Sequence, residues 1–200
     1  MTWIMTISQS EATGWLKSLY DRIKGPGDNV DNIMVAHSLR PHSMEGHLTL
    51  YKNVLHHTAN TLPKWYLECV GVYVSLVNQC EYCVRHHQQG LARLLDDDKR
   101  SDSMFRALET FKLASDFTAK EMAGLQYAEV LTNRPSQVTE ADILDLQTAG
   151  FNDGEILEVN QVVSYFAYAN RTVLGLGVNT DNDILGLAPS SGDSDNWTHR

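Results

Sequence analysis

Several classes of protein are excluded by what this chain lacks. No apolar stretch reaches the roughly 18 to 20 residues that a membrane-spanning helix needs, so we expect no membrane segment. Basic residues are in deficit, and the formal net charge of -9 at pH 7 argues against nucleic acid or an anionic membrane as the main partner. The N-terminal segment, Met1–Ile7, lacks the basic region and cleavage pattern of a signal peptide, which predicts a cytoplasmic protein.

Cysteine is also scarce, because the 200 residues contain only 3 cysteines. So few thiols cannot build the disulfide framework of a small secreted domain, and the cytosol keeps thiols reduced. The pair Cys80 and Cys83 is therefore better explained by catalysis or metal binding than by a structural disulfide. Cys69 has no partner by spacing and is predicted to be a small buried apolar side chain.

The chain shows no convincing β-alternation, no internal repeat and no phosphate-binding loop. Instead, apolar residues recur at helical spacing along most of its length. Ser8–Glu11, Thr118–Glu121 and Thr139–Asp142 match the capping boxes that start helices, and Asn152 can cap the last long helix. The sequence therefore predicts an all-α fold.

We expect this fold to be one domain over residues 1–188. Its parts are N-terminal helices over about 8–57, a redox core over about 61–115 and C-terminal helices over about 118–178. Residues 189–200 are rich in Ser, Asp and Gly and are predicted to form a loose polar tail.

The most informative string begins at Cys80 and, with Glu68, reads E-x11-C-x-x-C-x-x-x-H. Because a helix N-terminus favours an anion, a helix that begins near Cys80 is expected to lower the pKa of Cys83 in its first turn. His87 lies four residues after Cys83, on the same helix face, and can take its proton. A turn at residues 78–79 can bring the Glu68 carboxylate to this imidazole, which it would orient.

These groups suffice for thiol redox chemistry. Attack of a thiolate on the O–O bond of a peroxide gives a sulfenic acid. The second thiol condenses with it to form a disulfide, which an external dithiol reduces by exchange. The cycle requires no metal, haem or flavin.

The motif resembles that of the AhpD-like alkylhydroperoxidases, within the carboxymuconolactone decarboxylase superfamily. Residues 138–156 and 165–178 look like the peroxidase-related branch of that superfamily, and the resemblance covers about residues 40–180. It implies an AhpD-like helical bundle, with the C-x-x-C at the N-terminus of a core helix, and a homo-oligomer.

The resemblance also implies roles for the motif residues. Cys83 would be the peroxidatic thiol and Cys80 the resolving thiol and proton donor, with Glu68 and His87 as the proton relay. The best-studied members carry a histidine between the two cysteines, where this chain has Tyr82.

The predicted function is therefore a thiol-dependent peroxidase that reduces small hydroperoxides with electrons from an external dithiol. One alternative is a protein thiol–disulfide oxidoreductase. Another is a non-catalytic metal-binding or scaffold protein, in which His56 or His57 joins the cysteines, Glu68 and His87 as ligands. His86 is expected at the surface or at a subunit interface, since it points away from the face that carries Cys83 and His87.

Overall fold

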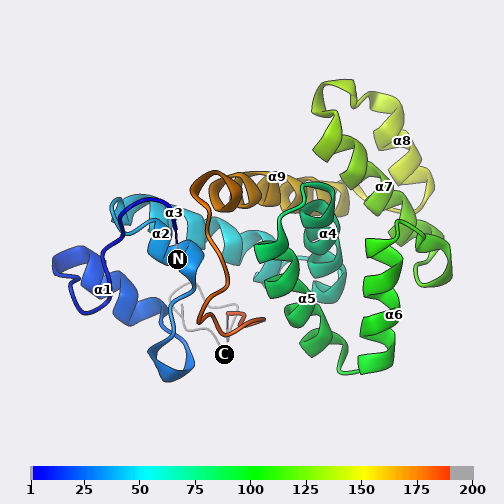
Figure 1. The fold of residues 1–200 in the computed structure, drawn as a ribbon. Coiled ribbons are helices and arrows are strands. Elements are labelled where there is room, and N and C mark those ends of the chain that lie inside the picture. Colours follow the sequence, from blue (N-terminus) through cyan, green and yellow to red (C-terminus); the bar gives the residue numbers. More distant parts are fainter. Residues whose placement is uncertain (1, 190–200) are drawn as a thin grey trace.

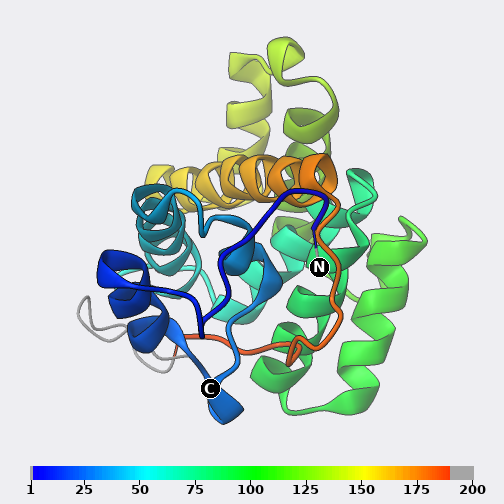
Figure 2. The ribbon, with the colours of Figure 1, turned by 60° about the vertical axis from the view of Figure 1, so that its left-hand side comes forward.

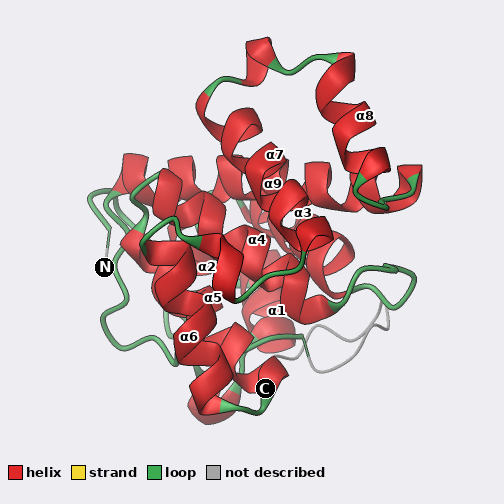
Figure 3. Cartoon of the chain, turned by 90° about the vertical axis from the view of Figure 1, so that its right-hand side faces the viewer, coloured by secondary structure: helices red, strands yellow, loops and turns green. Residues whose placement is uncertain are grey.

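The structure is a computed structural model that describes residues 2–189. No β-strand occurs within this range, so the all-α prediction is confirmed (Figure 3). The predicted polar tail lies, from residue 190 onward, outside the described residues. The α-helices in the described range are α1 (Gly14–Ile23), α2 (Asn32–Ala36), α3 (Pro41–Tyr51), α4 (Lys64–Val77), α5 (Glu81–Leu95), α6 (Asp98–Glu109), α7 (Ala119–Asn133), α8 (Glu140–Thr148) and α9 (Asp153–Leu176).

Capping side chains start several of these helices. Thr118 caps α7 and Asn152 caps α9, each through a reciprocal capping box, as the sequence predicts. The prediction for Ser8–Glu11 is wrong, because α1 begins only at Gly14. Glu11 does accept a hydrogen bond from the Ser8 amide at 3.1 Å, but this contact closes a turn, and extended backbone at Thr13 then redirects the chain.

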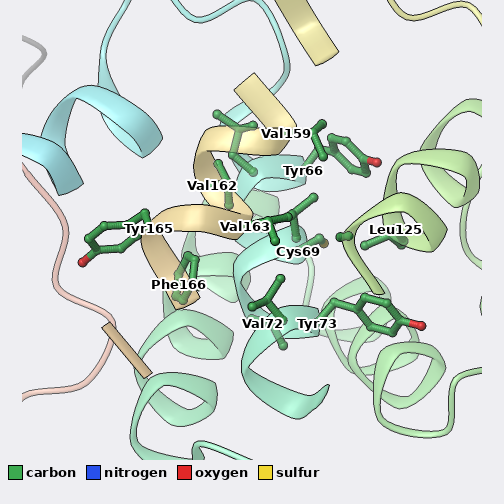
Figure 4. Close-up of a cluster of buried hydrophobic side chains, with 14 of the residues drawn as sticks. Tyr66, Cys69, Val72, Tyr73, Leu125, Val159, Val162, Val163, Tyr165 and Phe166 are labelled. Atoms are coloured by element: carbon green, nitrogen blue, oxygen red, sulfur yellow. The ribbon is translucent and has the colours of Figure 1, made fainter. Parts of the chain in front are cut away.

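Helix α4 is the centre of the molecule. All its residues from Tyr66 to Ser75 are buried, and α5, α7 and α9 pack around it (Figure 1). Figure 4 shows side chains of α4 and α9 interlocked, with Leu125 of α7 completing the cluster. Burial on all sides explains why α4 carries almost no polar residues, and it makes its one buried carboxylate, Glu68, a notable exception.

A short turn joins α4 to α5 and sets the two helices side by side (Figure 1). Gln79 adopts the left-handed region with φ of 56°, and the Cys80 amide donates a 2.8 Å hydrogen bond to the Ser75 carbonyl. This backbone bond ties the start of α5 to the last turn of α4. The C-x-x-C motif therefore begins a helix, next to the buried face of its predecessor.

The N-terminal helices α1 to α3 form a second, smaller core at one side of the molecule (Figure 2). The segment after α9 runs back between this part and α5, as Figures 1 and 2 show. The Asn32 side chain donates to the carbonyls of Asn179 and Asp181, and Arg93 of α5 donates to the Gly186 carbonyl. The segment thus bridges the two parts.

None of the helices in residues 2–189 combines the length and apolar character that crossing a bilayer requires.

The close packing of α4 on α9 gives a stability prediction. A Cβ atom at Gly71 would lie 2.2 Å from a ring carbon of Phe166, which is buried and cannot withdraw. We expect Gly71→Ala to destabilise the fold by about 1–3 kcal/mol, measured by urea unfolding. Gly46→Ala is the matched control, because nothing lies within 4 Å of its Cβ position in α3. Equal midpoints for both variants would contradict this account of the interface.

Candidate functional site

The two motif cysteines lie at the N-terminus of α5 as free thiols. Cys80 is the N-cap residue and Cys83 lies in the first turn, with exposed fractions of 0% and 3%. Both are therefore closed off from bulk solvent. Cys69, predicted to be a buried apolar side chain, lies in the core with no exposed surface.

The two thiols share their protons as a coupled pair. The pKa of Cys80 is lowered, mainly because the Cys83 thiol hydrogen-bonds to its sulfur and also because the Cys83 amide and the His87 charge favour its thiolate. The pKa of Cys83 is raised by that same thiol–thiol bond and by burial. The expectation that Cys83 carries the low-pKa thiol is thus wrong for this conformation. The thiol and the backbone amide of Cys83 both donate hydrogen bonds to the sulfur of Cys80. The negative charge of the pair is therefore more stable on Cys80.

Asn170 of α9 supports the thiol pair, and the motif search missed it. Its side chain is fully buried, donates to the Ser75 hydroxyl at 3.1 Å and accepts from the Asn78 amide at 2.9 Å. It also hydrogen-bonds to the motif cysteines, which lowers the pKa of both. The sequence does contain a sign of this residue. Asn170 is a polar residue on an otherwise apolar face of a helix, four residues after Phe166 and three before Val173.

Glu68 and His87 lie against each other across the α4–α5 hairpin. Glu68 Oε2 is 2.7 Å from Nδ1 of His87, and Oε1 is 3.7 Å from Nε2 of His56. Burial alone would raise the pKa of Glu68, but the charge and hydrogen bond of His87, with a smaller effect of His56, lower it instead. The carboxylate is therefore ionised in the interior and holds the imidazole in one orientation.

A small cavity connects this pair to one of the two thiols. Its volume is about 60 Å³, and Cys83, Glu68 and His87 all line it, together with His47 and Tyr165. Cys80 is not part of the lining. The remaining wall is largely apolar and comes from the N-terminal helices and the C-terminal segment: Ile23, Val30, Ile33, Met34, Leu48 and Leu187. The cavity thus offers a small molecule access to Cys83 rather than to Cys80.

His86 and Tyr82 belong to a neighbouring polar cluster. The prediction that His86 is a surface or interface residue is wrong, because it is buried and its Nε2 lies 3.1 Å from Oδ2 of Asp183. Tyr82 donates to the same oxygen at 2.8 Å, accepts from the Ile33 amide and stacks on the His86 ring. Tyr82 therefore anchors the C-terminal segment and does not continue the proton relay. Asp183, which lies about 100 positions away in sequence, could not be found from the motif.

Asp31 adds a second carboxyl group to the cavity wall. Burial, reinforced by the negative charge of Asp183, raises its pKa to about 6, against the favourable effects of His86, Asn29 and His87. An ionised Asp31 is thus costly in the folded state near neutral pH.

The described residues give no support to the metal alternative. Within 2–189, no group of three or more His, Cys, Asp or Glu side chains is arranged so that it could hold a metal ion. His56 does approach Glu68, but His57 is directed elsewhere and accepts a hydrogen bond from the Ala59 amide. The predicted set of ligands is therefore not assembled in the described residues.

Comparison with known proteins identifies the fold. No protein-family model and no curated protein sequence matches the chain. Among solved structures, an alkylhydroperoxidase AhpD core, an uncharacterized peroxidase-related protein from Ralstonia eutropha JMP134, matches with a TM-score of 0.78 and 19% identity over 90% of this chain and 93% of that one. An uncharacterized peroxidase-related protein from Silicibacter sp. TM1040 matches with a TM-score of 0.68 and 22% identity, over 77% and 80% of the two chains.

A third solved structure with this fold is a debrominase. The debrominase Bmp8, in complex with 2,3,4-tribromopyrrole, matches with a TM-score of 0.70 and 13% identity over 91% of this chain and 93% of that one. These likenesses show that the chain has the AhpD-like fold, as its motif predicted. Its chemistry must be argued from its own side chains.

The raised pKa of Asp31 predicts a pH-dependent stability. Its ordinary pKa is near 4 and its folded pKa is about 6, so the wild type loses stability as the pH rises between these values. Asp31→Asn removes that loss, and we expect it to be more stable than wild type by about 1–3 kcal/mol at pH 7, with little gain at pH 4. Urea unfolding at both pH values measures this. Asp145→Asn, on the exposed side of α8, is the control, and an Asp31→Asn gain independent of pH would contradict the assignment.

Proposed function

We propose that the chain is a thiol-dependent peroxidase that reduces small hydroperoxides through Cys83 and Cys80. One observation carries the proposal: Cys83 lines a small cavity together with the hydrogen-bonded pair Glu68 and His87, while Cys80 lies behind it within hydrogen-bonding reach. Nucleophile, resolving thiol and proton-handling pair are thus together in a place that only a small molecule can enter.

The first step would move a proton within the thiol pair. The Cys80 thiolate accepts the proton of the Cys83 thiol along their hydrogen bond, which leaves the thiolate on the sulfur that lines the cavity. Cys83 then attacks the terminal oxygen of the hydroperoxide. The S–O bond forms, the O–O bond breaks, and the leaving oxygen takes up a proton to become an alcohol or water.

The second step would close the disulfide. Cys80 attacks the sulfur of the Cys83 sulfenic acid, the S–S bond forms, and hydroxide leaves as water with the proton of the Cys80 thiol. Glu68 and His87 would carry that proton, since the charge of His87 acts on Cys80 and Glu68 holds its ring. In sum, two thiols and one hydroperoxide give a disulfide, an alcohol and water. An external dithiol would restore the thiols by exchange, which requires the oxidised protein to expose one of the two sulfurs.

Burial of both cysteines favours this function over protein thiol–disulfide exchange. With exposed fractions of 0% and 3%, neither sulfur can be reached by the disulfide of a folded partner in this conformation. The cavity volume of about 60 Å³ is less than half of the roughly 150 Å³ that accommodates benzene. We therefore expect hydrogen peroxide and short alkyl hydroperoxides to react faster than cumene hydroperoxide.

The shared fold of Bmp8 gives a second candidate, reductive dehalogenation of a small aromatic compound. The aromatic lining of the cavity, with Tyr51 and Tyr165 among its residues, favours it, but the cavity of about 60 Å³ would have to widen to admit such a substrate. The thiolate would take the halogen, the substrate carbon would take a proton, and Cys80 would displace halide to form the same disulfide. Release of bromide from 2,3,4-tribromopyrrole by the reduced protein, without reaction with peroxide, would support this candidate instead.

A cytoplasmic location and assembly into a homo-oligomer are part of the proposal. Large exposed apolar side chains, including Trp3 at 79%, Met5 at 81% and Phe111 at 51%, would be partly covered by a second copy. Light scattering on the purified protein measures the subunit count.

The thiol roles predict distinct outcomes for the two cysteines. Cys83→Ser is expected to abolish peroxide consumption, because the nucleophile is lost. Cys80→Ser is expected to allow one turnover, slower than in wild type because the acceptor of the Cys83 proton is lost, after which the unresolved sulfenic acid on Cys83 is oxidised further to the sulfinic acid. Stopped-flow mixing of the reduced protein with hydrogen peroxide, followed by mass spectrometry of the Cys80–Cys83 peptide, measures both.

Cys69→Ala, in the core away from the cavity, is the control and is expected to keep the wild-type rate. Undiminished peroxide consumption by Cys83→Ser would refute the proposed function. The proposed function would also be refuted if the wild-type protein consumed no peroxide.

The proton-handling pair gives a separate prediction. Glu68→Gln and His87→Phe are each expected to slow oxidation of the thiol pair by about 10²-fold or more, since each removes acid–base help. Glu129→Gln is the matched control, because that carboxylate accepts from Tyr73 outside the cavity. The same stopped-flow assay applies, and wild-type rates in both relay variants would exclude the relay while leaving the thiol chemistry intact.

A further inference from the structure

His47 of α3 contains a buried polar atom that no other residue in the described part of the chain satisfies. Its exposed fraction is 5%, and its Nε2 lies 3.1 Å from the hydroxyl of Tyr165 on α9. Its Nδ1 is fully buried and, among residues 2–189, has no hydrogen-bond partner. Such atoms are rare in folded proteins because leaving one unpaired costs free energy. The His47–Tyr165 pair therefore has hydrogen-bonding capacity that the described residues do not use.

A count of hydrogens shows which kind of partner is missing. The neutral imidazole of His47 carries one N–H and the phenol of Tyr165 one O–H, and a single hydrogen bond joins them. Whichever group donates in that bond, one polar hydrogen of the pair is left without an acceptor in the described protein. The pair therefore has a spare donor, and its missing partner is an acceptor such as an oxygen atom.

Both groups keep their protons near neutral pH. Burial, together with the nearby His37, lowers the pKa of His47 to about 3, so its ring is neutral. Burial raises the pKa of Tyr165, and the negative charges of Cys83 and Glu68 raise it further. Because the hydroxyl hydrogen of Tyr165 can rotate, the spare donor can be presented from the phenol, while Nε2–H of His47 donates to the phenol oxygen.

The spare donor lies at the cavity that contains the nucleophile. His47, Tyr165 and Cys83 all line it, and the effect of a Cys83 charge on Tyr165 shows that the two residues are neighbours. Figure 4 shows Tyr165 at the edge of the apolar cluster, on the side of α9 opposite to Leu125. The ring of Tyr51 packs against Tyr165 with centroids 5.7 Å apart and so restricts its movement.

We propose that Tyr165, held by His47, donates a hydrogen bond and then its proton to the leaving oxygen of the hydroperoxide. This inference rests on the proposed peroxidase function. As Cys83 bonds to the terminal oxygen and the O–O bond breaks, negative charge develops on the other oxygen. Tyr165 transfers its proton to that oxygen, which leaves as an alcohol or water, and the phenolate is reprotonated from solvent. Tyr165 is thus a catalytic residue, and His47 is a positioning residue.

The test compares two small oxidants that differ in their leaving group. Attack on hydrogen peroxide expels hydroxide, a strong base that needs a proton donor, whereas attack on peroxynitrite expels nitrite, a weak base that leaves without one. Tyr165→Phe is expected to slow oxidation of the Cys80–Cys83 pair by hydrogen peroxide about 10²-fold. Its rate with peroxynitrite is expected to stay within about 3-fold of wild type, because one donor matters only to a strongly basic leaving group.

Two further variants separate positioning and structural effects. His47→Leu is expected to reproduce part of the loss with peroxide, and His47→Gln to restore it, since an amide N–H can still donate to the phenol oxygen. Tyr168→Phe is the matched control, because its hydroxyl pairs with His37 and does not line the cavity. It is expected to react like wild type with both oxidants.

The outcomes are distinguishable. Equal slowing of Tyr165→Phe with both oxidants would assign Tyr165 a structural role, and no slowing with either would exclude it from the reaction; each overturns the inference and leaves the peroxidase proposal standing. Wild-type protein that reacts with neither oxidant would overturn both.

Discussion

The turn between α4 and α5 is the constraint on which the rest of the site depends. The bond from the Cys80 amide to the Ser75 carbonyl ends one helix and starts the next within a few residues. As a result, Cys80 takes the N-cap position, and Glu68 on one helix meets His87 on the other. A longer connection would leave the same residues in the chain without a fixed distance between them.

Buried charge is the cost that this arrangement imposes. An isolated carboxylate in the interior would be strongly unfavourable, and Glu68 remains ionised only because two imidazoles surround it. Replacing such a pair with apolar residues is often neutral or stabilising. Stability therefore does not explain its presence at the centre of an otherwise apolar helix, whereas the proposed proton transfer would.

The parts of the structure that could be predicted are those encoded over short distances. Capping boxes and apolar periodicity predicted the helices. The E-x11-C-x-x-C-x-x-x-H spacing predicted the contact between Glu68 and His87, because a hairpin of two helices places these two positions next to each other. The charge distribution within the thiol pair was not predictable, because it depends on which donors face which sulfur. Asn170 and Asp183 were missed for a related reason: they reach the motif from about 90 to 100 positions away, and no local pattern encodes such contacts.

The origin of the cavity wall has a consequence for the order of folding. The wall around Cys83 joins the N-terminal helices to the segment near residues 183–187, and contacts over such distances form late, after helical hairpins. A partly folded chain can thus contain a complete thiol motif but no enclosed space around it. The proposed selectivity for small molecules would therefore arise only when the N-terminal helices and the C-terminal segment pack around Cys83. Before that point, the thiols would be open to reaction with larger molecules as well.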